Sequence, residues 1–245
     1  MKKEYGYILI AYILMQLSGF VGYPLVFKAG QFLGMDAVKM KELVPGYWLV
    51  ISFSLTLLIV WLILRKTNRT SKLERMEPLP VGQSVFWAVI GVFLALFAQR
   101  IAIAIEAALG IEMGSQNTES IIQIIELVPA VMIAASVIGP ILEEIVFRKI
   151  LFGSLYEKYS FTVSALISSV IFSLAHMELE HTILYASMGF TFAFLYVKTK
   201  RIIVPICAHV AMNSLVVVVQ YFYADEIEKM MKEAEQMQQM ILWFM

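Results

Sequence analysis

The residues best suited to chemistry in this sequence form three pairs, each spaced four positions apart. They are Glu144 and Arg148, Phe172 and His176, and His209 and Asn213, with Glu143 directly before the first pair. Residues four apart lie on one face of an α-helix. Each pair therefore presents both of its side chains to the same side of the helix that carries it.

Glutamate, histidine and asparagine can together supply what peptide hydrolysis needs, namely a base for water, a proton carrier and a donor to the oxyanion. A carboxylate removed from bulk water is a stronger base for activating a water molecule. A neighbouring histidine can orient the same water and carry its proton to the leaving amine. An asparagine amide is a neutral donor that can stabilise the developing oxyanion. The three groups therefore predict a hydrolytic site, provided that the fold brings them together in a cavity that water can reach.

Composition places these residues in a membrane protein. Of 245 residues, 60% are hydrophobic and 16% are charged, and the mean hydropathy is +0.78. Soluble domains are nearer half apolar and a quarter charged. The formal net charge is zero, so nothing indicates a nucleic-acid partner. A single cysteine, Cys207, excludes an intramolecular disulfide or a thiolate metal cluster.

Seven apolar segments are candidates for membrane-spanning helices, each of which needs about 20 apolar residues. They are residues 7–27, 47–64, 84–109, 121–160, 161–177, 182–199 and 202–223. We therefore expect an all-α, polytopic transmembrane bundle of about seven spans, within a range of six to eight, forming a single domain over residues 1–224. Residues 225–245 show the periodicity of an amphipathic helix lying in the membrane interface.

The basic residues predict the orientation of the chain. With the N-terminus in the cytoplasm, 13 of the 19 Lys and Arg residues fall on the cytoplasmic side. Lys and Arg are retained on that side, so we expect a multi-pass protein of the cell membrane with a cytoplasmic N-terminus. The remaining basic residues are five on the outer side and Arg100, which lies within a span.

The long apolar segment 121–160 must continue past Arg148 if the three groups are to meet. At 1.5 Å per residue, a helix that ends near Glu157 places Glu143 about 21 Å above its inner end, level with His176. A helix that ended at Arg148 would keep the two apart. We therefore expect one long helix, kinked at Gly139 and Pro140, with Arg148 buried and paired with Glu144.

The motifs Glu-Glu-x-x-x-Arg, Phe-x-x-x-His and His-x-x-x-Asn, in this order, resemble the type II CAAX prenyl protease family, also called CPBP or Abi. The resemblance covers residues 129–220 and implies a helical intramembrane endopeptidase. It implies that Glu143 activates water with help from His176, and that His209 and Asn213 stabilise the oxyanion. Glu144, Arg148 and Phe172 would then support the site.

Other functions are compatible with the same residues. The acidic pair and Arg148 alone would serve as a buried ion pair in a non-catalytic membrane regulator, immunity or scaffold protein. A proton-coupled transporter is disfavoured because no paired repeat halves are evident. Two histidines and a glutamate suit zinc, but no His-Glu-x-x-His motif occurs. We therefore expect no metal or other cofactor, with a zinc-dependent form of the protease as the alternative.

We expect the remaining polar and aromatic residues to have structural roles. His181 is expected to be solvated in a short outer connection, and Arg100 and Glu106 to be structural partners or to line a cavity. Tyr185 is expected to pack among apolar neighbours. The expected partners are the lipid bilayer and a membrane-associated peptide or protein substrate. Prenylated proteins, bacteriocin precursors, pheromone peptides and membrane-protein tails fit equally.

Overall fold

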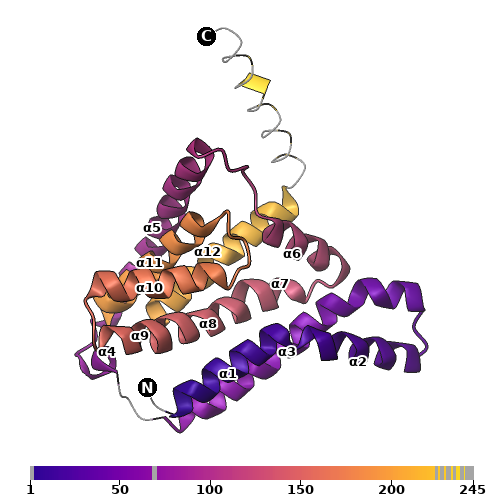
Figure 1. Ribbon diagram of the computed structural model, residues 1–245, viewed down its shortest axis with the longest axis horizontal. Coiled ribbons are helices and arrows are strands. Elements are labelled where there is room, and N and C mark those ends of the chain that lie inside the picture. Colours follow the sequence, from indigo (N-terminus) through magenta and orange to yellow (C-terminus); the bar gives the residue numbers. More distant parts are fainter. Residues whose placement is uncertain are drawn as a thin grey trace.

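The computed structural model describes residues 3–67 and 71–223, together with six individual residues between 226 and 240. The predicted amphipathic helix over residues 225–245 therefore lies for the most part outside the described residues. All regular structure within the described residues is helical. Its elements, shown in Figure 1, are α1 (Lys3–Leu17), α2 (Gly19–Phe32), α3 (Ala37–Arg65), α4 (Lys72–Arg75), α5 (Val81–Ala108), α6 (Gln116–Leu127), α7 (Val131–Ile133), η1 (Ala134–Ile138), α8 (Gly139–Glu143), η2 (Glu144–Phe152), α9 (Gly153–Tyr156), α10 (Phe161–Leu174), α11 (Thr182–Thr199) and α12 (Ile203–Phe222).

The predicted fold class, an all-helical membrane bundle, is confirmed. Among the described residues, α3, α5 and α12 are long and apolar enough to cross a membrane. The helices α1 and α2 would add a fourth span if they act together, although they are bent by 57° relative to each other. The expected count of about seven crossings stays a prediction.

The outer surface of the bundle is apolar, as contact with lipid requires. Large side chains such as Phe20, Phe93 and Phe97 are each more than 60% exposed. Soluble monomers rarely expose contiguous apolar surface of this kind. The exposed apolar faces of α2 and α5 therefore suit the hydrocarbon core of a bilayer.

The segment predicted as one long helix differs in detail from that prediction. The interruption lies at residues 128–130, between α6 and α7, and helical turns then continue from Val131 through Gly139 and Pro140 to Tyr156. Two π-helical stretches, η1 and η2, flank Pro140. Proline has no backbone N–H to donate, and a local change in hydrogen-bond spacing can accommodate it within a continuous helix. The expectation that the helix continues past Arg148 is confirmed.

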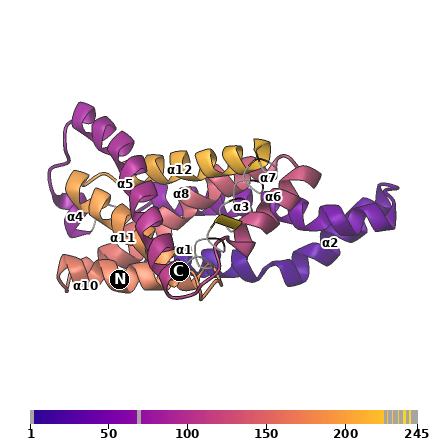
Figure 2. The ribbon, with the colours of Figure 1, turned by 90° about the horizontal axis from the view of Figure 1, so that it is seen from above.

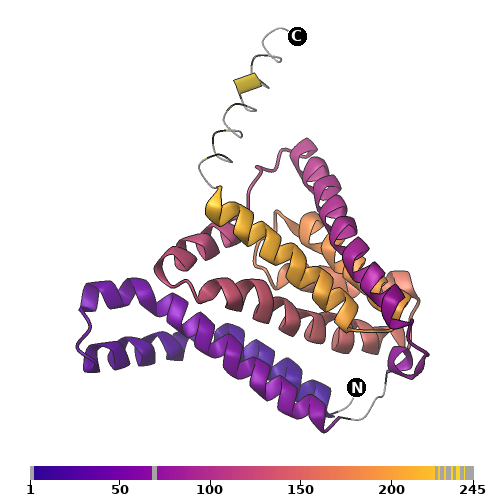
Figure 3. The ribbon, with the colours of Figure 1, turned by 180° about the vertical axis from the view of Figure 1, so that it is seen from behind.

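The helix α11 lies at the centre of the part of the molecule formed by α5, α10, α11 and α12. It packs between α10 and α5, and α12 packs on α5 (Figure 1 and Figure 3). Gly189 allows the close approach of α11 to α10, since a Cβ there would lie 2.8 Å from Ser169 Oγ and 3.0 Å from its Cα. By contrast, α2 and the first part of α3 extend away from this core, as Figure 2 shows.

Candidate active site

The predicted acidic pair, arginine and second histidine meet at a buried ion pair. Glu144 and Arg148 lie on η2, with Arg148 Nη1 3.1 Å from Glu144 Oε1. His209, on α12, has its Nδ1 atom 2.9 Å from the same Glu144 oxygen. Glu144, Arg148 and His209 are all at most 2% exposed. Because a carboxylate only accepts hydrogen bonds, His209 Nδ1 is the donor, which fixes the direction in which the ring faces.

Two aromatic rings enclose this ion pair. The guanidinium carbon of Arg148 lies 4.1 Å from the centroid of the Phe172 ring and 5.4 Å from that of Phe192. The imidazole of His209 stacks on Phe192, with centroids 4.5 Å apart and planes 22° from parallel. The aromatic faces stabilise the buried cation and hold the histidine ring, so Phe172 and Phe192 both support the site.

Glu143 occupies the more open side of the cluster. It ends α8, directly before η2, and its side chain is 18% exposed, whereas that of Glu144 is fully buried. Its Oε2 atom lies 3.8 Å from His209 Nε2, the ring nitrogen that does not face Glu144. The two adjacent glutamates thus differ, since Glu144 binds Arg148 and His209 whereas Glu143 makes no hydrogen bond among the described residues.

His176 lies in the turn just beyond α10. Its Nδ1 atom is 2.9 Å from the carbonyl oxygen of Phe172 and must donate to it. In the neutral imidazole, Nε2 then carries no proton and can accept a hydrogen bond. Phe172 also joins the two histidines, since its ring makes edge contacts with His176 and with His209 at centroid distances of 4.6 and 6.1 Å. Glu143 is close enough to His176 to interact with it electrostatically.

Asn213 is one turn beyond His209 on α12, as the four-residue spacing predicts. It is partly exposed, whereas His209 is buried. None of the hydrogen bonds between described residues uses its amide. The structure therefore brings Glu143, Glu144, Arg148, Phe172, His176 and His209 into one cluster, and it places Asn213 on the same helix face as His209.

Tyr185 is a member of the site that sequence reasoning assigned to packing. Its ring stacks on His176, with centroids 4.0 Å apart and planes 24° from parallel. Its hydroxyl donates to Glu178 Oε2 over 2.6 Å. Tyr185 and Phe192 are seven residues apart on α11 and so lie on the same face of the helix. That spacing is the signal in the sequence that could have identified both residues.

Glu178, in the loop between α10 and α11, collects several hydrogen bonds. Ser115 Oγ donates to its Oε2 atom over 2.8 Å, and the backbone N–H of Asn117 donates to Oε1 over 2.8 Å. Burial opposes ionisation of Glu178, but the hydrogen bonds from Tyr185, the Asn117 N–H and Ser115 outweigh it and hold the pKa of the carboxyl below its ordinary value. The carboxylate therefore joins the start of α6 to the loop that carries His176.

The expectation that His181 is solvated is wrong. His181 is 5% exposed, and its Nδ1 atom lies 3.0 Å from Glu106 Oε2. The other oxygen of Glu106 accepts the backbone N–H of Leu184 over 2.9 Å. This N–H belongs to the first turn of α11, which lacks an internal acceptor for it. Glu106 is thus a structural partner, as predicted, because it satisfies a helix end and one histidine.

The arrangement of side chains does not fit a zinc site. Among the described residues, no three His, Cys, Asp or Glu side chains are arranged to hold a metal ion. One nitrogen of His209 is bonded to Glu144, and Glu144 is also paired with Arg148. A zinc ion requires at least three protein ligands, and the ion pair of Glu144, Arg148 and His209 does not supply them.

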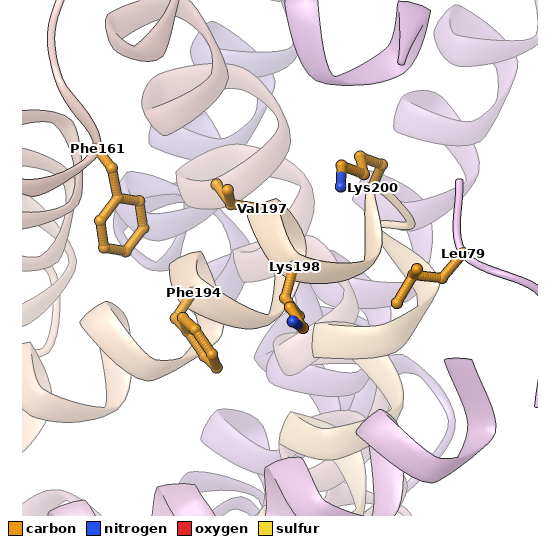
Figure 4. A pocket seen from close by; sticks show the side chains of 6 residues that line it. All are labelled: Leu79, Phe161, Phe194, Val197, Lys198 and Lys200. Carbon is orange, nitrogen blue, oxygen red and sulfur yellow. The ribbon is translucent and has the colours of Figure 1, made fainter. Parts of the chain in front are cut away.

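A separate surface pocket of about 310 Å³ lies near the last turn of α11. Its lining is Leu79, Phe161, Phe194, Val197, Lys198 and Lys200 (Figure 4). It contains none of the residues of the three motifs. The ionic and aromatic contacts therefore locate the candidate site better than this pocket does.

Comparisons with known proteins agree with the three motifs. The family described as "Type II CAAX prenyl endopeptidase Rce1-like" matches residues 125–215. A Bacillus subtilis (strain 168) protein named "Putative membrane peptidase YdiL" is 48% identical over 221 residues, which cover 90% of each chain. The chain belongs to the Rce1-like family of type II CAAX endopeptidases. "Membrane-embedded CAAX protease MroQ" of Staphylococcus aureus (strain USA300) is 32% identical over 233 residues, 92% of this chain and 94% of that one.

Membership in the Rce1-like family confirms the predicted class of enzyme, a CAAX-protease-like membrane peptidase. The matched residues 125–215 include all three motifs, from Glu143 to Asn213. No solved structure matches the chain.

Proposed function

We propose that this Rce1-like peptidase hydrolyses a peptide bond of a membrane-associated peptide or protein, with Glu143 and His176 activating water. The observation that carries the proposal is the unequal environment of the two adjacent glutamates. Glu144 is fully buried and bound to Arg148 and His209, whereas Glu143 is partly exposed and faces His209 Nε2. Of these two glutamates, Glu143 is the one whose carboxylate can take up a proton from water without breaking the ion pair.

His176 is suited to carry that proton onward. Donation from its Nδ1 to the Phe172 carbonyl leaves Nε2 as the acceptor of the neutral ring. In the proposed reaction the water oxygen attacks the carbonyl carbon of the substrate while Glu143 accepts the proton of the water. The proton then passes through His176 to the leaving amine as the peptide C–N bond breaks.

His209 and Asn213 would stabilise the oxyanion that forms when water attacks. Because Glu144 accepts from Nδ1 of His209, a protonated His209 would direct its Nε2 proton towards the side of Glu143. The Asn213 amide, one turn away on α12, supplies a second donor. Donors held in place before the reaction stabilise developing charge without reorganisation during the reaction.

The remaining parts of the proposal concern cofactor and location. We propose that the reaction needs no metal ion, since Glu143 and His176 would activate water without one. We also propose that the protein resides in the cell membrane with its N-terminus in the cytoplasm, because that orientation leaves most Lys and Arg residues of the connections on the cytoplasmic side.

The test is cleavage of a membrane-anchored reporter peptide by the purified protein in lipid nanodiscs. Glu143→Gln should abolish cleavage while the protein stays folded, since the amide cannot accept the proton of water. Glu112→Gln, which changes an exposed loop glutamate in the same way, is the matched control and should cleave normally. Chelator should leave wild-type cleavage unchanged.

Two results would contradict the proposal. Loss of wild-type cleavage on chelation, with recovery on adding zinc, would show that the reaction depends on a metal ion. Normal activity of Glu143→Gln in cells, together with no cleavage of any reporter by the wild type, would favour a regulatory or scaffold role.

A further inference from the structure

We infer that Tyr185 is a positioning residue for His176, held in place by Glu178; the inference rests on the proposed role of His176 as proton carrier. The two rings come from different helices, since Tyr185 lies in the first turns of α11 and His176 follows α10. Their faces are stacked at a centroid distance of 4.0 Å. The stack connects α11 directly to a reacting group.

The backbone around His176 explains why a further contact is needed. The last residue of α10 is Leu174, and His176 lies in the turn that follows. Met177, the next residue, has a left-handed backbone conformation with φ of 60°. His176 therefore lacks a following helical turn to restrict its ring. The hydrogen bond from Nδ1 to the Phe172 carbonyl fixes one ring atom. The imidazole could still rotate about this hydrogen bond, and such a rotation would move Nε2.

Phe172 and Tyr185 restrict this rotation from two helices. The Phe172 ring contacts the imidazole edge-on, with planes 68° apart, whereas the Tyr185 ring lies nearly parallel to it. Aromatic pairs in these geometries contribute about 0.5–1.5 kcal/mol beyond the area that they bury. Loss of the Tyr185 face would let the plane of the imidazole turn and so displace its Nε2 atom.

Tyr185 is itself held by hydrogen bonds. Its hydroxyl donates to Glu178 Oε2 over 2.6 Å and lies 3.2 Å from Ser115 Oγ. Ser115 donates to the same glutamate oxygen. The tyrosine side chain is 6% exposed, and its polar end is thus satisfied by a carboxylate in a loop next to the site. Glu178 thereby fixes the ring that in turn fixes His176.

Three variants separate positioning from packing. Tyr185→Phe keeps the stacking ring but loses the hydroxyl that Glu178 holds, and it should lower kcat less than Tyr185→Leu does. Tyr185→Leu removes the stacking face and should lower kcat by roughly 10- to 100-fold with KM unchanged, as expected for a misplaced catalytic group. Tyr159→Leu, an exposed tyrosine in the loop before α10, is the matched control and should behave as wild type.

The spectrum of His176 gives a readout that does not depend on cleavage. The chain has three histidines, so ring resonances of isotope-labelled histidine can be assigned with single His→Gln variants. Tyr185→Leu should shift the His176 ring resonances, because the ring current of the stacked tyrosine is lost, and should leave those of His181 in place. Should Tyr185→Leu fail to fold, Tyr185→Met carries the same expectations.

Several outcomes would overturn the inference. They are wild-type kcat in Tyr185→Leu, an equal loss of kcat in Tyr185→Phe and Tyr185→Leu, and unchanged His176 resonances in Tyr185→Leu. A wild-type protein that cleaves no reporter would count against the proposed function alone. In that case the His176 resonances still decide whether Tyr185 stacks on the ring.

Discussion

At the scale of single residues, the site depends on giving two adjacent glutamates different surroundings. Successive residues on a helix point about 100° apart, so Glu143 and Glu144 face different neighbours although they share one backbone segment. Glu144 faces Arg148 and His209, which are buried, and Glu143 faces the more exposed side. A single helix thus supplies both a structural carboxylate and a candidate base.

Replacing the buried carboxylate should affect the fold itself. Glu144→Gln leaves Arg148 buried without its counter-charge, and removing one partner of such a pair costs about 3–5 kcal/mol. Thermal unfolding in detergent micelles should show a lower midpoint than for the wild type. Glu112→Gln, at an exposed position, should leave the midpoint unchanged; equal midpoints for both variants would contradict a strong role for the ion pair.

Asn213 should act on catalysis and not on stability. Removing one oxyanion donor lowers kcat by about 10²–10³-fold in other hydrolases, and we expect Asn213→Ala to do the same with KM unchanged. The neighbouring residue Ser214 has similar partial exposure on α12, so Ser214→Ala is the control. A normal kcat for Asn213→Ala would remove this residue from the proposed mechanism.

At the scale of elements, α11 decides whether the three groups meet. It packs against both α10, which precedes His176, and α5, and its one face carries Tyr185 and Phe192 to the two histidines. Gly189 lies between these two aromatic residues in the sequence, where a Cβ would meet Ser169 of α10 at 2.8–3.0 Å. The absence of a side chain at Gly189 therefore allows the two helices to pack this closely.

Gly189→Val should separate α10 from α11. Any Cβ at Gly189 would lie within 3.0 Å of the Ser169 backbone, so the helices must shift apart. Overpacking of this kind costs typically about 1–3 kcal/mol, and we expect a lower unfolding midpoint together with a lower kcat. Gly82→Val, at a glycine in the first turn of α5 with open space around it, is the control.

The loop network around Glu178 should make stability depend on pH. Its pKa is lowered in the folded protein, so its contribution is fully present above the ordinary pKa of about 4.3 and is lost as pH falls through the lowered value. The unfolding midpoint of the wild type should fall in this acid range. Glu178→Gln should remove that part of the decrease, and an unchanged pH profile in the variant would contradict the network.

At the scale of the whole molecule, polar contacts join connections that are far apart in the sequence at two places. The carbonyl oxygen of Leu79, after α4, accepts from Arg201 Nε over 2.8 Å, and Glu74 pairs with Lys149, so η2 and the segment after α11 meet the α4 region. The hydrogen bond from Ser115 to Glu178 joins the connection before α6 to the one between α10 and α11. The assignment of these groups to the inner and outer sides of the membrane, which rests on the basic residues, stays a prediction.

Labelling of introduced cysteines tests the absolute orientation. In a Cys207→Ser background, Met113→Cys should react with an impermeant maleimide in intact cells, and Glu77→Cys only after lysis. Both positions are exposed and in connections between helices. The opposite pattern would reverse the predicted orientation.

The sequence by itself determined the class of protein, the order of the three motifs and the family. Composition requires apolar helices because lipid cannot pair with backbone amides, and spacing of four aligns side chains on one helix. Only the tertiary structure decided that His209 pairs with Glu144, that His181 is buried against Glu106, and that Tyr185 covers His176. These contacts join residues from different helices, and their partners depend on how the helices rotate and pack, which periodicity along one helix does not specify.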